Sequence, residues 1–266
     1  MRKYFTVFSL SFQNEFTYRL NFILWRFRNV LRILMTLFLW TAVFSSRDAA
    51  LGYSRTQMIS YVFLVLIIQT LVLAAPSNDN VGGEINNGDL SNYLVKPISY
   101  LNFWLSRDWA SKFLNIIFAV IEFSLLRLVF RPQLQFSENM VHILLGIIVW
   151  VVGIFTYFFL TKMAVFVAFW YPENTWGIMF IVLVFMEILS GFIFPLDVLP
   201  TMAQSALQFT PFPYLIYYPV AILIGKFSIA HSLQFLLQSL IWLFITHFLA
   251  QKLWRLGLKV YSASGR

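Results

Sequence analysis

The sequence contains no cysteine and little charge, since Asp, Glu, Lys and Arg make up 11% of its 266 residues. The absence of cysteine excludes disulfides and thiolate metal sites. Hydrophobic residues account for 60% of the chain and aromatic residues for 19%, which is far from the composition of a soluble domain. Several apolar runs reach the roughly 20 residues that a helix needs to cross a bilayer, whereas the alternation of membrane β-strands is missing. The composition indicates an all-α integral membrane protein.

Motifs for catalysis and nucleotide binding are also missing. Nothing in the sequence matches G-x-x-x-x-G-K-[ST], H-E-x-x-H or G-x-S-x-G. The longest polar interval is too short to form an ATPase domain. The three histidines are spread out, because His142 falls in one apolar segment and His231 and His247 lie 16 positions apart in another. This favours polar contacts near helix ends over a metal site. We therefore expect a chain that is not an enzyme and binds neither a metal nor a cofactor.

The apolar runs predict a single transmembrane domain over residues 1–266 with six spans. These spans are 29–44 (extended backwards by 22–25), 56–75, 109–130, 140–160, 176–194 and 230–254. Residues 1–19 differ from a span because polar residues interrupt them. Four phenylalanines nevertheless fall on one helical stripe, namely Phe5, Phe8, Phe12 and Phe16. This pattern is typical of a helix that lies in the membrane interface.

The basic residues are distributed by membrane side. If the N-terminus lies inside, six spans leave five of the 19 Lys and Arg residues outside, and these are Arg47, Arg55, Arg127, Arg131 and Lys226. An excess of Lys and Arg on the cytoplasmic side is the usual signature of orientation. We therefore expect a multi-pass protein of the plasma membrane whose termini and polar interval 76–108 face the cytoplasm. This distribution explains the net charge of +8 better than nucleic-acid binding does.

The polar interval 76–108 contains a predicted short helix. Asp89 suits the N-cap, Leu90, Tyr93 and Leu94 follow at i, i+3 and i+4 spacing, and Pro97 ends the pattern. The helix thus has one apolar face, which predicts either a docking surface for a partner or a free interfacial helix.

Residues 195–228 form the second unusual segment. The segment is too apolar for an ordinary loop and too rich in proline for one helix. It predicts a re-entrant helical hairpin between the fifth and sixth spans, packed against the bundle. In this hairpin Asp197 is expected to cap the first short helix, and the breaks are set by Pro195, Pro200, Pro211 and Pro213.

Two carboxylates lie within predicted spans, Glu122 in the third and Glu187 in the fifth. Ionisable groups at such depth are candidates for ion coupling along a transport pathway. A protonated or hydrogen-bonded structural carboxyl fits the same positions. Arg127 follows Glu122 by five positions, about 140° around a helix, so it is a poor partner for this carboxylate.

The order of these segments resembles the permease subunits of type-2 (ABC-2) ABC exporters. The similarity covers nearly the whole chain, and two stretches carry it most closely. Residues 85–99 read INNGDLSNYLVKPIS, similar to a loop pattern I-x-x-G-x-L-x-x-x-L-x-x-P of one branch of these permeases. Residues 191–200 read GFIFPLDVLP and are followed by TPFP at 210–213 and Tyr218-Pro219, similar to the entry of that branch's hairpin.

The resemblance implies a permease that dimerises, with itself or with a paralogous permease, in contact with membrane lipid. It implies two separate cytoplasmic ATPase subunits, which would bind ATP and magnesium. The short helix would be the coupling helix, with site residues Glu84, Asp89, Leu90, Tyr93, Leu94 and Pro97. An aromatic, weakly charged interior suits an amphipathic or lipophilic substrate, such as a drug-like compound, a lipid or a peptide, but polysaccharide exporters share this architecture.

Two other functions remain open from the sequence. The first is an ion-coupled secondary transporter or channel that uses Glu122 and Glu187, and a more distant one is a membrane-embedded enzyme. Secondary transport predicts flux that follows an ion gradient without ATP.

Overall fold

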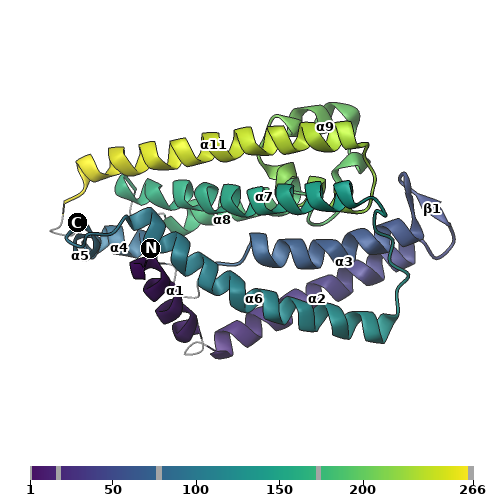
Figure 1. Cartoon of the computed structure of the whole chain (residues 1–266), viewed down its shortest axis with the longest axis horizontal. Coiled ribbons are helices and arrows are strands. Elements are labelled where there is room, and N and C mark those ends of the chain that lie inside the picture. The colour runs from purple at the N-terminus through teal and green to yellow at the C-terminus, as the bar shows by residue number, and fades with distance from the viewer. Residues whose placement is uncertain (1, 16–18, 76–79, 172–174, 263–266) are drawn as a thin grey trace.

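The structure is a computed structural model that describes residues 2–15, 19–75, 80–171 and 175–262. Its helices form an elongated bundle in which the long helices run lengthwise, some of them obliquely to the others (Figure 1). The only strands among the described residues are two short antiparallel ones, β1 (Ala49–Ala50) and β2 (Tyr53–Ser54). The predicted all-α class is confirmed.

The described residues of the N-terminal half form six helices: α1 (Arg2–Glu15), α2 (Arg19–Val43), α3 (Arg55–Val72), α4 (Val81–Asn86), α5 (Ser91–Leu94) and α6 (Tyr100–Phe130). Helix α3 begins at a capping box, in which the Ser54 side chain accepts from the Gln57 N–H and the Gln57 side chain accepts from the Ser54 N–H. Helix α1 packs on α6, where Phe8 and Phe12 both contact the Phe113 ring. The predicted position of α1 in the membrane interface stays a prediction, and Phe16 lies outside the described residues.

The C-terminal half contains the long helices α7 (Met140–Phe166) and α11 (Ile229–Val260), with α8 (Thr175–Leu189) between them in sequence. The shorter elements are η1 (Val167–Phe169), η3 (Leu196–Val198), α9 (Thr201–Gln208), η4 (Phe212–Tyr214) and α10 (Tyr217–Leu223). Asn139 and Ser228 cap α7 and α11 through their side chains. Helices α7 and α11 pack along each other over much of their length.

Four described helices are long and apolar enough to cross a membrane: α3, α6, α7 together with η1, and α11. They correspond to the predicted second, third, fourth and sixth spans. Helix α2 has 25 residues but carries Arg26, Arg28 and Arg32, and the apolar α8 has 15 residues. The first and fifth spans therefore stay predictions. Helix α8, which corresponds to the predicted fifth span, ends at Leu189, whereas the predicted span extends to residue 194.

The two ends of the bundle have different contents (Figure 1). The start of α1, the short helices α4 and α5 and the end of α11 gather at one end. The β1–β2 hairpin and α9 lie at the other end. The N-terminal helix, the 81–99 segment and the end of α11 thus share one end of the bundle, and that this end faces the cytoplasm stays a prediction.

The larger hydrophobic core surrounds the segment that was predicted to be a re-entrant hairpin. Helix α10 lies against α7 and α3, and Leu215, Ile216 and Val220 are completely buried. Gly191 adopts φ +85 just before this segment, a conformation that glycine tolerates best. In this segment α9 follows Pro200 and η4 contains Pro213, and the re-entrant course of the segment stays a prediction. Its depth in a membrane stays a prediction.

A second core lies at the end of the bundle that holds α4 and α5. Leu90 and Trp104 are fully buried there together with Phe166 and Ala250. The rings of Tyr100 and Trp254 stack with centroids 4.6 Å apart. This core therefore fixes the 81–99 segment against α6, α7 and α11.

Candidate functional site

The 81–99 segment is organised around Glu84, which lies in α4, a helix that the sequence did not predict. The Tyr93 and Tyr100 hydroxyls donate to the Glu84 carboxylate at 3.0 and 2.6 Å. Burial, followed by the charge of Glu84, raises the pKa of Tyr93 to about 12. The Tyr93 hydroxyl therefore stays protonated, and remains a donor, well above the pH at which an ordinary tyrosine ionises.

Tyr261 connects this segment to the end of α11. Its hydroxyl donates to the Gly88 carbonyl at 2.6 Å and accepts from the Ser91 N–H at 3.1 Å. Gly88 has φ +81, so the turn before α5 depends on a residue without a side chain. Tyr261 therefore holds the start of α5, a contact that no sequence pattern indicated across this separation.

Two details of the predicted coupling helix are wrong. Helix α5 begins at Ser91 with Leu90 at the N-cap and no side-chain cap, so Asp89 does not cap it. Leu90 does not face a partner, because it is buried in this chain's own core. The exposed apolar side chains are instead Leu94, at 45%, and Val95, at 82%.

The N-terminal helix also contacts this segment. Lys3 donates through its Nζ to the Pro97 carbonyl, and the Tyr4 hydroxyl accepts from the Ser99 N–H at 3.1 Å. Pro97 itself is exposed. Helix α1 is therefore attached to the same loop as α11.

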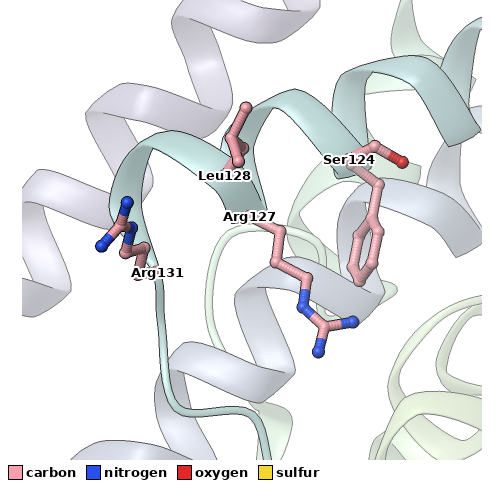
Figure 2. A pocket seen from close by; sticks show the side chains of 5 residues that line it. Ser124, Arg127, Leu128 and Arg131 are labelled. Atoms are coloured by element: carbon pink, nitrogen blue, oxygen red, sulfur yellow. The ribbon is translucent and has the colours of Figure 1, made fainter.

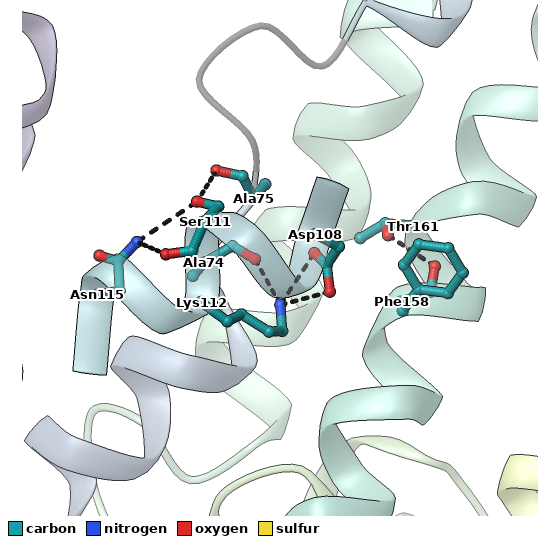
Figure 3. Close-up of polar contacts among 8 residues, drawn as sticks. All are labelled: Ala74, Ala75, Asp108, Ser111, Lys112, Asn115, Phe158 and Thr161. Carbon is teal, nitrogen blue, oxygen red and sulfur yellow. Dashed lines mark hydrogen bonds and ion pairs between the residues drawn. The ribbon is translucent and has the colours of Figure 1, made fainter. Parts of the chain in front are cut away.

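A buried polar cluster lies where α3 enters the loop (Figure 3). The Lys112 ammonium, completely buried, donates to the Asp108 carboxylate at 3.0 Å and to the Ala74 carbonyl at 2.6 Å. Next to it the Ser111 hydroxyl donates to the Ala75 carbonyl at 3.0 Å. Because buried charges are costly unless they are paired, this cluster fixes the end of α3 onto α6.

The cluster continues along α6 towards Glu122. Asn115 donates to the Ser111 carbonyl at 2.9 Å and accepts from Arg26 Nη1 at 3.2 Å. Arg26 Nε then donates to Glu122 Oε1 at 2.7 Å, and the second nitrogen and oxygen of the same groups pair as well. Hydrogen bonds thus connect the loop end of α3 with the interior of the bundle.

Glu187 is paired in a similar way. Arg32 Nη1 donates to its carboxylate at 2.7 Å, and the Arg32 guanidinium lies over the Phe192 ring at 5.1 Å. The Arg26–Glu122 side chains are 6% and 12% exposed, whereas Arg32–Glu187 are 35% and 38% exposed. Both candidate carboxylates therefore bind arginines of α2, partners that sequence reasoning missed because they lie 96 and 155 residues away.

Asp197 has a different role from the expected one. Helix α9 has Pro200 at its N-cap and no side-chain cap. Asp197 lies in η3 after the extended Pro195, and it pairs with Lys226 and accepts from the Tyr53 hydroxyl at 2.9 Å. Asp197 therefore connects the two ends of the 195–228 segment with the β1–β2 hairpin. Pro211, the other predicted break, immediately precedes η4.

Among the described residues, no group of three or more His, Cys, Asp or Glu side chains could hold a metal ion. His142 and His231 contact Ser137 and Ser228 at 2.9 Å in the first turns of α7 and α11. For His142 and His231, these hydrogen bonds are the polar contacts near helix ends that the sequence predicts. His247 contacts Gln251 within α11.

The long apolar helices and the internally paired charges define a multi-pass membrane protein. The sequence matches a family model described as an ABC-2 family transporter protein over residues 30–265. The chain therefore belongs to the ABC-2 family of transporter membrane proteins. Membership makes it the permease component of an ABC transporter, whose partner is an ABC ATP-binding subunit. No curated protein and no solved structure was found to match it.

Proposed function

We propose that this chain is the membrane permease of an ATP-driven exporter, and that the surface around α5 receives the mechanical signal from the ATPase subunit. The observation that supports this proposal is the contrast within α5 and its neighbours. Leu90 is anchored in the core, while Leu94 and Val95 are exposed next to it. An exposed apolar pair on a firmly held segment suits a contact that must transmit force.

The anchoring of the segment supports the same role. Glu84 holds Tyr93 and Tyr100, and Tyr261 holds the turn at Gly88. A push on Leu94 and Val95 would therefore move α6 and α11 together with the loop and would not simply bend the loop. ATP binding can shift the permease only if the ATPase contacts its two states unequally, and this surface is where such a difference would arise.

The polar contacts inside the bundle supply a route for that signal. The Lys112 and Ser111 contacts fix the loop end of α3 to α6, and Arg26 connects α6 with α2. Three helices of the bundle would thus respond together to a movement of the loop. In this proposal Glu122 is a structural partner of Arg26 within the route.

The remaining parts of the proposal concern the assembly. Two permeases, identical or paralogous, would pair in the plasma membrane with both termini in the cytoplasm, and ATP and magnesium would bind to the ATPase subunits. The cargo would be amphipathic or lipophilic, such as a drug-like compound, a lipid or a peptide. Ion-coupled transport by Glu122 and Glu187 is less favoured, because arginines already pair with both carboxylates and the family is that of ABC transporters.

Affinity purification of the tagged permease with its ATPase subunit tests the proposal. We expect Leu94→Asp with Val95→Asp to lose the ATPase subunit, because the apolar contact would have to bury two carboxylates. The matched control is Leu51→Asp, an exposed leucine in the β1–β2 hairpin at the other end of the bundle, which should retain it. Full retention by the double variant would refute this surface, and export that continues without ATP on an ion gradient would favour the secondary transporter.

A further inference from the structure

A hollow of about 460 Å³ lies between α2, the start of α3 and the end of α6. Its apolar wall includes Leu37, Phe38, Phe63 and Phe130. Phe38 and Phe130 are exposed, and their rings meet at 6.1 Å. One side of the hollow is therefore formed by exposed aromatic and aliphatic side chains.

Two arginines border this hollow, Arg55 at the start of α3 and Arg131 at the end of α6. Both side chains are exposed, and neither forms a hydrogen bond or an ion pair with any residue that the structure describes. No carboxylate is among the described residues that line the hollow. This contrasts with Arg26 and Arg32, whose charges are both paired.

Other features add to the positive potential. Arg55 and Thr56 occupy the first turn of α3, and the N-terminus of a helix carries a partial positive charge that favours anions. Arg131 also borders a neighbouring hollow of about 340 Å³ together with Arg127. Figure 2 shows the two guanidinium groups on either side of the last turn of α6.

We propose that the hollow between α2, α3 and α6 binds an anionic phospholipid. Arg55 and Arg131 would hold the phosphate through charge-assisted hydrogen bonds, which a planar guanidinium forms well. Thr56 and Gln133 border the same space and offer further polar contacts. The acyl chains would lie along Phe38 and Phe130.

The chemistry of the wall favours a lipid over free phosphate. A free anion would use only the arginine side of the hollow and would leave the aromatic side exposed. A phospholipid covers both, and α6 ends in Leu128, Val129 and Phe130, which are all exposed. The site lies at the opposite end of the bundle from α5 (Figure 1), so it is independent of ATPase docking.

Native mass spectrometry of the purified transporter in detergent tests this site with phosphatidylglycerol, phosphatidylcholine and inorganic phosphate as probes. We expect phosphatidylglycerol to bind more tightly than phosphatidylcholine. Arg55→Gln with Arg131→Gln should weaken phosphatidylglycerol binding roughly tenfold, as the loss of a charged hydrogen bond implies. Phosphatidylcholine binding should fall less, because the choline ammonium already offsets the charge of its phosphate. The control Arg47→Gln with Arg255→Gln removes the same charge from exposed positions outside the hollow and should keep wild-type binding.

Three results would overturn the proposal. The first is equal phosphatidylglycerol binding by the double variant and its control. The second is competition by inorganic phosphate at equal concentration, which would make a free anion the ligand. The third is a changed oligomeric state with unchanged lipid binding, which would make the hollow an interface between copies. If the glutamine variant does not fold, Arg55→Lys with Arg131→Lys keeps the charge and should retain part of the lipid preference.

Discussion

Arg26 and Glu122 form a two-pronged ion pair inside the bundle, with Arg26 Nε 2.7 Å from Glu122 Oε1. The two residues are 96 positions apart in the sequence. Arg26 also donates to Asn115, so one side chain of α2 holds two positions of α6. Glu122, a candidate for ion coupling, therefore forms a contact that links α6 to α2.

Removal of either Arg26 or Glu122 alone should lower the stability of the protein. Arg26→Met leaves Glu122 without its cation, and the loss of one member of a buried pair typically costs about 3 kcal/mol or more. Thermal unfolding in detergent should therefore show a clear fall in Tm. The double variant Arg26→Met with Glu122→Leu should recover much of it, since it leaves no unpaired buried charge at this site. A single variant as stable as the wild type would contradict this structural role.

Gly191 should not accept a side chain. A Cβ there would lie 2.7 Å from the Tyr217 Cβ and 2.9 Å from the Tyr61 hydroxyl, and φ is +85. We expect Gly191→Ala to lower the free energy of unfolding by about 2 kcal/mol or more. Gly177→Ala in α8 is the matched control, because a Cβ there meets nothing within 4 Å. Equal thermal stability of the two variants would refute this packing.

Tyr261→Phe tests the link between α11 and the turn before α5. The change removes the hydroxyl that contacts Gly88 and Ser91, a loss of about 1 kcal/mol per hydrogen bond. Hydrogen exchange should become faster at the Ser91 amide and its neighbours. Tyr171→Phe, at an exposed tyrosine, should leave this exchange unchanged. Unchanged protection in Tyr261→Phe would mean that the core around Leu90 alone fixes the turn.

Glu84→Gln tests the electrostatics of the loop. The pKa of Tyr93 is raised from 10.0 to about 12, first by burial and then by Glu84. Because the folded-state pKa is the higher one, the stability that this site contributes is present below pH 10 and is lost as the pH rises towards 12. The glutamine variant should titrate Tyr93 at a lower pH, though above 10 because burial remains.

Ultraviolet absorbance of tyrosinate, resolved by comparison with Tyr93→Phe, measures this titration. Glu138→Gln is the control, because Glu138 is exposed and is not among the causes of the Tyr93 shift. An unchanged Tyr93 pKa in Glu84→Gln would show that burial alone sets it.

The sequence by itself determined the class and the order of segments. Long apolar runs predict membrane helices because both conditions for a span can be read within one segment. The segment must be long enough to cross the bilayer, and its backbone must satisfy its own hydrogen bonds. The breaks at Pro200 and Pro213 were predictable for the same reason, since proline acts on its own backbone. Lys112 and Asp108 also lie at i, i+4 spacing, so their ion pair was predictable from the sequence as well.

Only the tertiary structure decided which charges meet and which apolar side chains are buried. Arg26 pairs with Glu122, Arg32 with Glu187 and Lys226 with Asp197, between segments that the sequence does not place side by side. Likewise, Leu90 and Leu94 belong to the same apolar pattern, yet Leu90 is buried and Leu94 is exposed. Periodicity defines the face of a helix, but the neighbour that covers that face is set by how distant segments pack.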